Sequence, residues 1–234
     1  MTNSKYVAIL LDLDDTLLNF SDCEREAFKI AFAIVGTNTS DSERIRVWQT
    51  YQSISSNYWR HKQNNGLSRQ QIIEASLQDT FAVLKRNFLN VPQLAQTYWN
   101  TFCQTACLNP EVKETIKLLS NDYRLGIVTN GYADSQASRL EASGLASYFQ
   151  SIVVSEVVGC RKPASEIFNI ALKELQVKPF EVLFVGDSLA HDYKGAANAG
   201  IDFCYFNQRS QSFKDLQPKY SIEKMSQLIG LLPG

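Results

Sequence analysis

Long hydrophobic runs are missing from this chain of 234 residues, and so is any excess of charge of one sign. No apolar run approaches the ~20 residues that a membrane-spanning helix needs, so we expect no membrane partner. Lysine and arginine number 23 and aspartate and glutamate 24, which gives a formal net charge of −1. This balance offers no electrostatic attraction for a nucleic acid polymer or for an anionic membrane surface.

Cysteine and histidine are also scarce. The two histidines, His61 and His191, have no ligand partners at a spacing typical of a metal site. The cysteines are odd in number and lack the paired spacing of a zinc site or a disulfide framework. They are Cys23, Cys103, Cys107, Cys160 and Cys204. We therefore expect reduced thiols and a cytoplasmic location; the first five residues also lack the layout of a signal peptide.

The chain shows two kinds of hydrophobic pattern, which together predict an α/β protein with an insertion. Residues 1–17 and 108–234 alternate short apolar runs with helical patterns, which indicates a Rossmann-like parallel sheet core. Residues 18–107 contain almost no strand signal and repeat apolar residues at helical intervals. We interpret them as an inserted all-helical domain of about four helices, two of which begin with capping boxes at 40–43 and 68–71.

Strands of the core are expected at five short apolar runs, and helices between them. The expected strands are 7–11, 125–128, 152–154, 182–185 and 203–206. Asn109 and Pro110 are typical of a helix start and predict a helix to about residue 120. Further helices are expected to end near residue 143, over 166–175 and over 192–199.

Two aspartates, Asp12 and Asp14, follow the first expected strand. Ligands of open α/β sheets bind beyond the carboxyl ends of the strands, and residues i and i+2 of an extended segment point the same way. Both carboxylates can therefore face one site. Two acids this close resist joint ionisation unless a cation or a shared proton relieves them. The pair indicates a metal site, an acid/base pair or both, although acidic residues also follow strands with no such role.

Polar side chains suited to phosphate chemistry follow three later strands. Thr129 and Asn130 end the second strand and could bind an oxyanion. Lys162 precedes a proline after the third, and lysine suits phosphate. Asp187 ends the fourth, with Asp192 shortly beyond it, and Mg²⁺ prefers such oxygen ligands. Each signal alone has a plain structural explanation as a turn, a solvated lysine or an acid at a helix start. No such explanation accounts for the position of all of these residues at the carboxyl ends of strands.

In this order the motifs resemble those of the haloacid dehalogenase-like hydrolase superfamily. The matching features are Asp-x-Asp-x-Thr at 12–16, Thr129, Lys162 before proline, and Gly-Asp-Ser with a further aspartate at 186–192. The resemblance covers the whole chain, and residues 18–107 look like the cap domain of that superfamily. It implies a phosphatase for a small-molecule phosphate ester, and it says nothing of the oligomeric state.

The resemblance also implies a role for each of these residues. Asp12 would be the nucleophile that forms an aspartyl-phosphate, and Asp14 would be the general acid and then the general base. Thr129, Asn130 and Lys162 would hold the phosphoryl oxygens. The Asp12 carboxylate, the Asp14 carbonyl and Asp187 would bind Mg²⁺, with Asp192 in support. Asp15 is expected only to form a turn or cap a helix.

Other classes of function remain open at this point. The dehalogenase branch of the superfamily lacks the second acid, so Asp14 favours phosphate over a carbon–halogen bond. The phosphonatase branch uses a lysine from a smaller cap, and Lys29 reads instead as a surface residue of a helix. A phospho-receiver signalling domain would not need the helical insertion. A pseudo-enzyme would use the same pocket for binding only. Such a protein would not need every catalytic residue type, and all of them are present in this sequence.

Within the phosphatases the chain resembles the pyrimidine 5′-nucleotidase branch. The similar stretches are 14–20, 51–59 and 129–140, the last with Gln136 and Arg139. Phe20, just past the catalytic loop, is the residue expected to contact the substrate. The expected substrate is a pyrimidine nucleoside 5′-monophosphate, and the alternative is a sugar phosphate or phosphoglycolate.

The helical insertion contains residues that would suit either substrate. An aromatic stripe could stack a base, although such a stripe normally packs between helices; a basic wall would suit a small acid. The aromatic residues are Trp48, Tyr51, Tyr58 and Trp59, and the basic ones are Arg44, Arg46, Arg60, Lys62 and Arg69.

Overall fold

The computed structural model describes residues 6–35, 40–61, 66–87, 90–208, 210 and 216–232. The chain divides into two compact units, Met1–Phe20 with Ala106–Gly234, and Ser21–Thr105. The sequence placed these divisions after residue 17 and before residue 108. The first unit contains the sheet and every residue that the sequence assigned to catalysis or metal binding.

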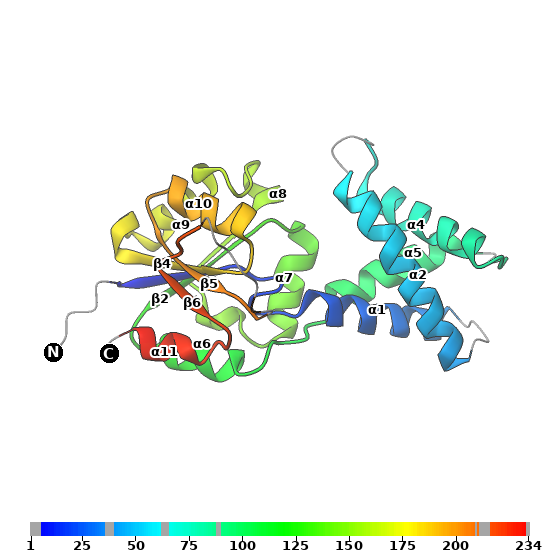
Figure 1. Cartoon of the computed structure of the whole chain (residues 1–234), viewed down its shortest axis with the longest axis horizontal. Helices are drawn as coiled ribbons and strands as arrows, with labels where there is room; N and C mark the ends of the chain where they lie inside the picture. The colour runs from blue at the N-terminus through cyan, green and yellow to red at the C-terminus, as the bar shows by residue number, and fades with distance from the viewer. Residues whose placement is uncertain are drawn as a thin grey trace. The chain divides into compact units, whose positions relative to one another are not determined.

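Six parallel strands form the sheet of the first unit, in the order β3-β2-β1-β4-β5-β6 (Figure 1). Their bounds are β1 (Ala8–Leu11), β2 (Arg124–Thr129), β3 (Ser151–Val154), β4 (Val182–Gly186), β5 (Asp202–Phe206) and β6 (Tyr220–Ile222). The predicted fold class is confirmed, and only the three-residue β6 was not expected from the sequence. From β1 the chain adds β2 and β3 on one side of the sheet and then β4, β5 and β6 on the other. The direction of strand addition thus reverses beside β1, and open α/β sheets bind ligands at such a switch point.

Helices cover both faces of the sheet (Figure 1). They are α6 (Val112–Leu119) and α11 (Gln227–Leu231) on one face, and α9 (Ser165–Leu175) and α10 (Lys194–Asn198) on the other. The other helical elements of this unit are the ten-residue α7 (Ala133–Ala142) and the shorter α8 (Ser155–Val158), η1 (Ala146–Tyr148), η2 (Pro179–Glu181) and η3 (Leu189–Tyr193). All four residues of β1 are fully buried, as expected for a parallel strand covered on both faces. The loop after β1 therefore begins at the buried centre of the sheet.

Four helices make up the second unit within the described residues: α1 (Phe20–Ile34, whose first residue belongs to the other unit), α2 (Asp41–Arg60), α4 (Arg69–Val83) and α5 (Val91–Cys103). The Phe28 ring packs at its centre, 5.1 Å from Trp48 and 5.0 Å from Tyr51 between ring centroids. Trp48 and Tyr51 therefore belong to helix packing, and they are not free to stack a base. No helix in the described ranges combines the length and apolarity needed to cross a bilayer.

The basic residues of the insertion are partly engaged in local contacts. The Arg69 guanidinium carbon lies 4.0 Å from the Trp99 ring centroid, and Arg44 lies 3.7 Å from Asp41. Lys62 lies outside the described residues. These local contacts weaken the interpretation of the basic residues as one wall for a small acid.

Some helix starts differ from the prediction. The capping box at Ser68 is confirmed, whereas the Ser40 side chain makes no capping bond. The helix expected from Pro110 begins at Val112, because the Asn109 amide donates to the Thr16 carbonyl (2.9 Å) and is used by the loop after β1.

The helix expected over 192–199 also starts differently. It is preceded by the π-helical turn η3, within which Asp192 lies, and α10 begins at Lys194. The Asp192 amide N–H donates to the Ser188 carbonyl (2.8 Å) inside this turn.

Candidate active site

The loop after β1 carries Asp12 and Asp14. The Asp12 amide N–H donates to the Val185 carbonyl of β4 (2.9 Å), which continues the sheet one residue past β1. The chain then turns sharply: Leu17 and Leu18 both donate to the Leu13 carbonyl (2.9 Å each). At the tip of this turn Asp15 has φ 57°. These backbone hydrogen bonds fix the shape of the short loop that carries Asp12 and Asp14.

Asp15 has the modest function that the sequence assigned to it. Its carboxylate accepts a hydrogen bond from the Phe20 amide (3.1 Å), the first residue of α1. An acceptor at this place satisfies an amide that a helix start leaves without a partner.

Lys162 is the cation of the site. Its side chain is 2% exposed, and Nζ lies 2.6 Å from Asp12 Oδ1 and 2.7 Å from Asp192 Oδ1. The Asn130 side chain holds the backbone of Lys162: its amide donates to the Lys162 carbonyl (3.0 Å), and its oxygen accepts from the Lys162 N–H (2.8 Å). Asn130 thus positions the lysine, and direct phosphate binding by Asn130 stays a prediction.

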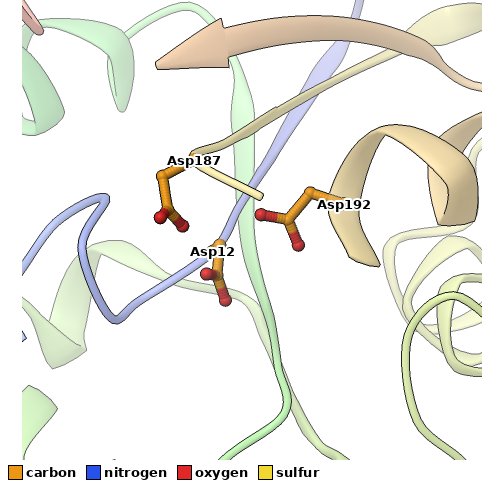
Figure 2. A group of neighbouring side chains, drawn as sticks. All are labelled: Asp12, Asp187 and Asp192. Atoms are coloured by element: carbon orange, nitrogen blue, oxygen red, sulfur yellow. The ribbon is translucent and has the colours of Figure 1, made fainter. Parts of the chain in front are cut away.

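Three carboxylates converge beside this lysine. One ligand oxygen each of Asp12, Asp187 and Asp192 lies within 4.8 Å of the others (Figure 2). Asp192 is fully buried, and its Oδ2 accepts from the Ser188 N–H (3.0 Å). A Cβ on residue 186 would overlap the Asp192 carboxylate, so the glycine at the end of β4 is what allows Asp192 to lie there.

The charges of this cluster are unbalanced. Burial raises the pKa of Asp12 well above its ordinary value, and Asp192 and Asp187 add to the effect. Burial also raises the pKa of Asp187 to about 7, with further contributions from Asp192 and Asp15. Burial alone would lower the pKa of Lys162, but Asp12 and Asp192 outweigh it and raise it. Three carboxylates against one ammonium fit a hard divalent cation such as Mg²⁺, which takes oxygen ligands.

Asp14 points to different partners. Arg139 Nη1 lies 2.6 Å from Asp14 Oδ1, and Gln136 Nε2 donates to Asp14 Oδ2 (2.8 Å) and to Thr129 Oγ1 (3.1 Å). The sequence singled out Gln136 and Arg139 only as part of a resemblance and gave them no role. Their spacing of three residues places them on one face of α7, but no local signal shows that this face meets the loop after β1.

The structure thus brings the expected residues into two adjoining groups. Asp12, Lys162, Asp187 and Asp192 form the acidic cluster with its lysine, and Thr129 joins Asp14 through Gln136. The Phe20 ring centroid lies 5.9 Å from the Arg139 guanidinium carbon. This distance places Phe20 beside the Asp14 group.

A family model described as haloacid dehalogenase-like hydrolase matches residues 9–206. The chain belongs to this family. The HAD-hydrolase YfnB of Bacillus subtilis (strain 168) is 29% identical over 97% of this chain and 96% of its own length. Its crystal structure bound to magnesium covers 97% of this chain and 98% of that one, with a TM-score of 0.81 at 28% identity.

Two further relatives in the family carry named activities. The pyrimidine 5′-nucleotidase YjjG of Escherichia coli (strain K12) is 26% identical over 97% of this chain and 98% of its own length. The glyceraldehyde 3-phosphate phosphatase of Methanopyrus kandleri is 30% identical over 91% of this chain and 88% of its own length. The family is a hydrolase family, and both of these relatives are named for small phosphate esters.

Proposed function

We propose that this protein is a Mg²⁺-dependent phosphomonoesterase that works through an aspartyl-phosphate on Asp12. The observation that carries the proposal is the pair of carboxylates on the loop after β1. Asp12 lies against Lys162 and Asp187, as a nucleophile beside a phosphate site needs. Asp14 lies close by on a separate set of partners. A dehalogenase would have no use for this second acid.

The reaction proceeds in two halves. An Asp12 carboxylate oxygen attacks phosphorus, the bond from phosphorus to the ester oxygen breaks, and Asp14 gives a proton to that leaving oxygen. Asp14 then takes a proton from water, which attacks the aspartyl-phosphate and releases inorganic phosphate from Asp12. Thr129 and Lys162, with Asn130, hold the phosphoryl oxygens through both halves.

Mg²⁺ is the cofactor that the acidic cluster fits. The Asp12 carboxylate, the Asp14 carbonyl and Asp187 would hold the ion, and Asp192 would support it through Lys162 and Ser188. When bound, the ion neutralises negative charge between the nucleophile and the phosphate. The magnesium in the YfnB structure supports this choice of ion.

For the substrate we propose a nucleoside 5′-monophosphate, with pyrimidines preferred. Support comes from YjjG and from a second pyrimidine 5′-nucleotidase, PynA of Streptococcus pneumoniae, which is also 26% identical. The burial of Trp48 and Tyr51 removes one argument for base stacking. Phe20, whose ring lies 5.9 Å from the Arg139 guanidinium carbon, remains the residue that we propose to contact the substrate. The phosphatase from Methanopyrus kandleri favours a second candidate, a three-carbon sugar phosphate; phosphoglycolate is a further alternative.

A panel of activity assays tests both the metal-dependent phosphatase activity and the proposed substrate. The purified protein should hydrolyse p-nitrophenyl phosphate with added Mg²⁺, and exhaustive chelation should abolish turnover. Full activity after chelation would overturn the metal assignment. Comparison of kcat/KM then ranks pyrimidine and purine monophosphates, glyceraldehyde 3-phosphate and phosphoglycolate. If either of the last two exceeds the best nucleotide tenfold, or by about 1.4 kcal/mol, the nucleotidase assignment is wrong and the phosphatase assignment stands.

A further inference from the structure

We propose that Arg139 and Gln136 are positioning residues that hold the Asp14 carboxylate in the orientation in which it donates and accepts a proton. The inference rests on the proposed phosphatase function and assigns roles to two residues that this function does not itself require. It concerns the first unit alone, because all of these residues belong to the α/β core.

Each oxygen of the Asp14 carboxylate has its own donor. Arg139 Nη1 lies 2.6 Å from Oδ1, and Gln136 Nε2 lies 2.8 Å from Oδ2. Two donors on two oxygens fix both the position of the carboxylate and its rotation about the Cβ–Cγ bond. A proton-transfer group loses efficiency when its geometry is loose, so this arrangement is suited to the proposed role of Asp14.

Arg139 and the Asp14 carboxylate that it binds differ in their exposure to solvent. The Arg139 side chain is 0% exposed, whereas the Asp14 side chain is 26% exposed. Arg139 therefore has no surface to offer a substrate, and Asp14 does. A buried guanidinium needs a carboxylate partner. Arg139 thus acts through Asp14 and not on the substrate itself.

Gln136 also connects the proton donor to the phosphate side of the site. The same Nε2 atom that binds Asp14 donates to Thr129 Oγ1 at 3.1 Å. A Cβ on residue 131 would overlap the Gln136 side chain, so Gly131 leaves the space in which Gln136 reaches both partners. This close approach gives the glycine after Asn130 a physical purpose.

A purely structural ion pair would stabilise the fold and affect all substrates equally. A positioning role has a different signature, because proton donation matters most when the leaving group is poor. Phenyl phosphate and p-nitrophenyl phosphate have similar shapes, and phenolate is the poorer leaving group. The value of kcat/KM reports steps up to aspartyl-phosphate formation, in which the leaving group departs.

The experiment compares both esters in Arg139→Met, Gln136→Met and a control, Leu140→Ala. Leu140 lies on the same helix, is 1% exposed and has an apolar side chain that cannot hydrogen-bond to Asp14, so the control destabilises α7 while keeping both donors to that carboxylate. We expect Arg139→Met to lower kcat/KM about 100-fold for phenyl phosphate and much less for p-nitrophenyl phosphate. Gln136→Met should show a smaller loss of the same kind, and it carries the test if Arg139→Met fails to fold. Leu140→Ala should leave the ratio of the two esters as in the wild type.

A double-mutant cycle adds a second readout. In an Asp14→Asn background, Arg139→Met should cause no further loss, because residues that act through one another are not additive. Equal losses on both esters, or a further full loss in the Asp14→Asn background, would overturn the inference while leaving the phosphatase function intact. A wild-type protein that hydrolyses neither ester would overturn the proposed function, and the inference with it.

Discussion

Replacement of Lys162 by methionine should destabilise the protein and remove most of its turnover. Methionine keeps the apolar stem but removes the ammonium group, which is 2.6 Å from Asp12 and 2.7 Å from Asp192 in a side chain only 2% exposed. Removal of one partner from a buried ion pair costs about 3–5 kcal/mol. For a chain of this size the melting temperature should then fall by roughly 6–20 °C.

The stability of the Lys162→Met variant should fall as the pH rises, because the acidic cluster then loses its protons. Burial raises the pKa of Asp187 from 3.8 to about 7 and that of Asp12 well above 3.8. A carboxyl group with a raised pKa binds its proton more tightly in the folded state. Its contribution to stability is therefore present below pH 3.8 and is lost as the pH rises through about 7. Lys162 opposes both shifts, so the metal-free variant should lose more stability between pH 5 and pH 8 than the metal-free wild type.

The assay is thermal unfolding in chelator at both pH values, combined with turnover of p-nitrophenyl phosphate in Mg²⁺. We expect kcat to fall about 10²–10³-fold, as for loss of one preorganised donor to a developing charge. Lys173→Met, on the exposed face of α9, is the matched control and should change stability by no more than about 0.5 kcal/mol. A Lys162→Met protein that melts and turns over like this control would refute the role given to the lysine.

Further substitutions test the other parts of the site. Asp12→Asn should abolish turnover, and phosphate trapped on the wild-type protein should map to Asp12 by mass spectrometry; a different modified residue would contradict the nucleophile assignment. Asp14→Asn should keep the stabilisation by Mg²⁺ but slow both half-reactions. Gly186→Ala should cost about 1–3 kcal/mol and weaken stabilisation by Mg²⁺, because its Cβ would overlap the Asp192 carboxylate. Gly230→Ala, whose Cβ would meet no atom within 4 Å, is the control and should leave both properties unchanged.

The sequence by itself determined five of the six strands and the order of the chemistry along the chain. Short apolar runs bounded by turn residues gave five of the six strands, because a strand covered on both faces must be apolar throughout. The short β6 carries no such run, and only its pairing with β5 shows that it is a strand. Asp12 could be placed at a ligand-binding edge because parallel strands expose their carboxyl ends together.

The tertiary structure alone decided which side chains meet. Lys162 reaches Asp12 across 150 positions of sequence, and Arg139 reaches Asp14 across 125. Such partners share no local spacing, so no periodicity reveals them, and their choice depends on how α7 and the loop before α9 pack at the sheet edge. In the helical unit, packing of α2 against α1 and α5 likewise buried Trp48 and Tyr51, where the sequence left base stacking open. The local sequence pattern therefore predicted which residue types form the site. Long-range packing decided which of them become partners, because buried charges are stable only where the fold brings an opposite charge to them.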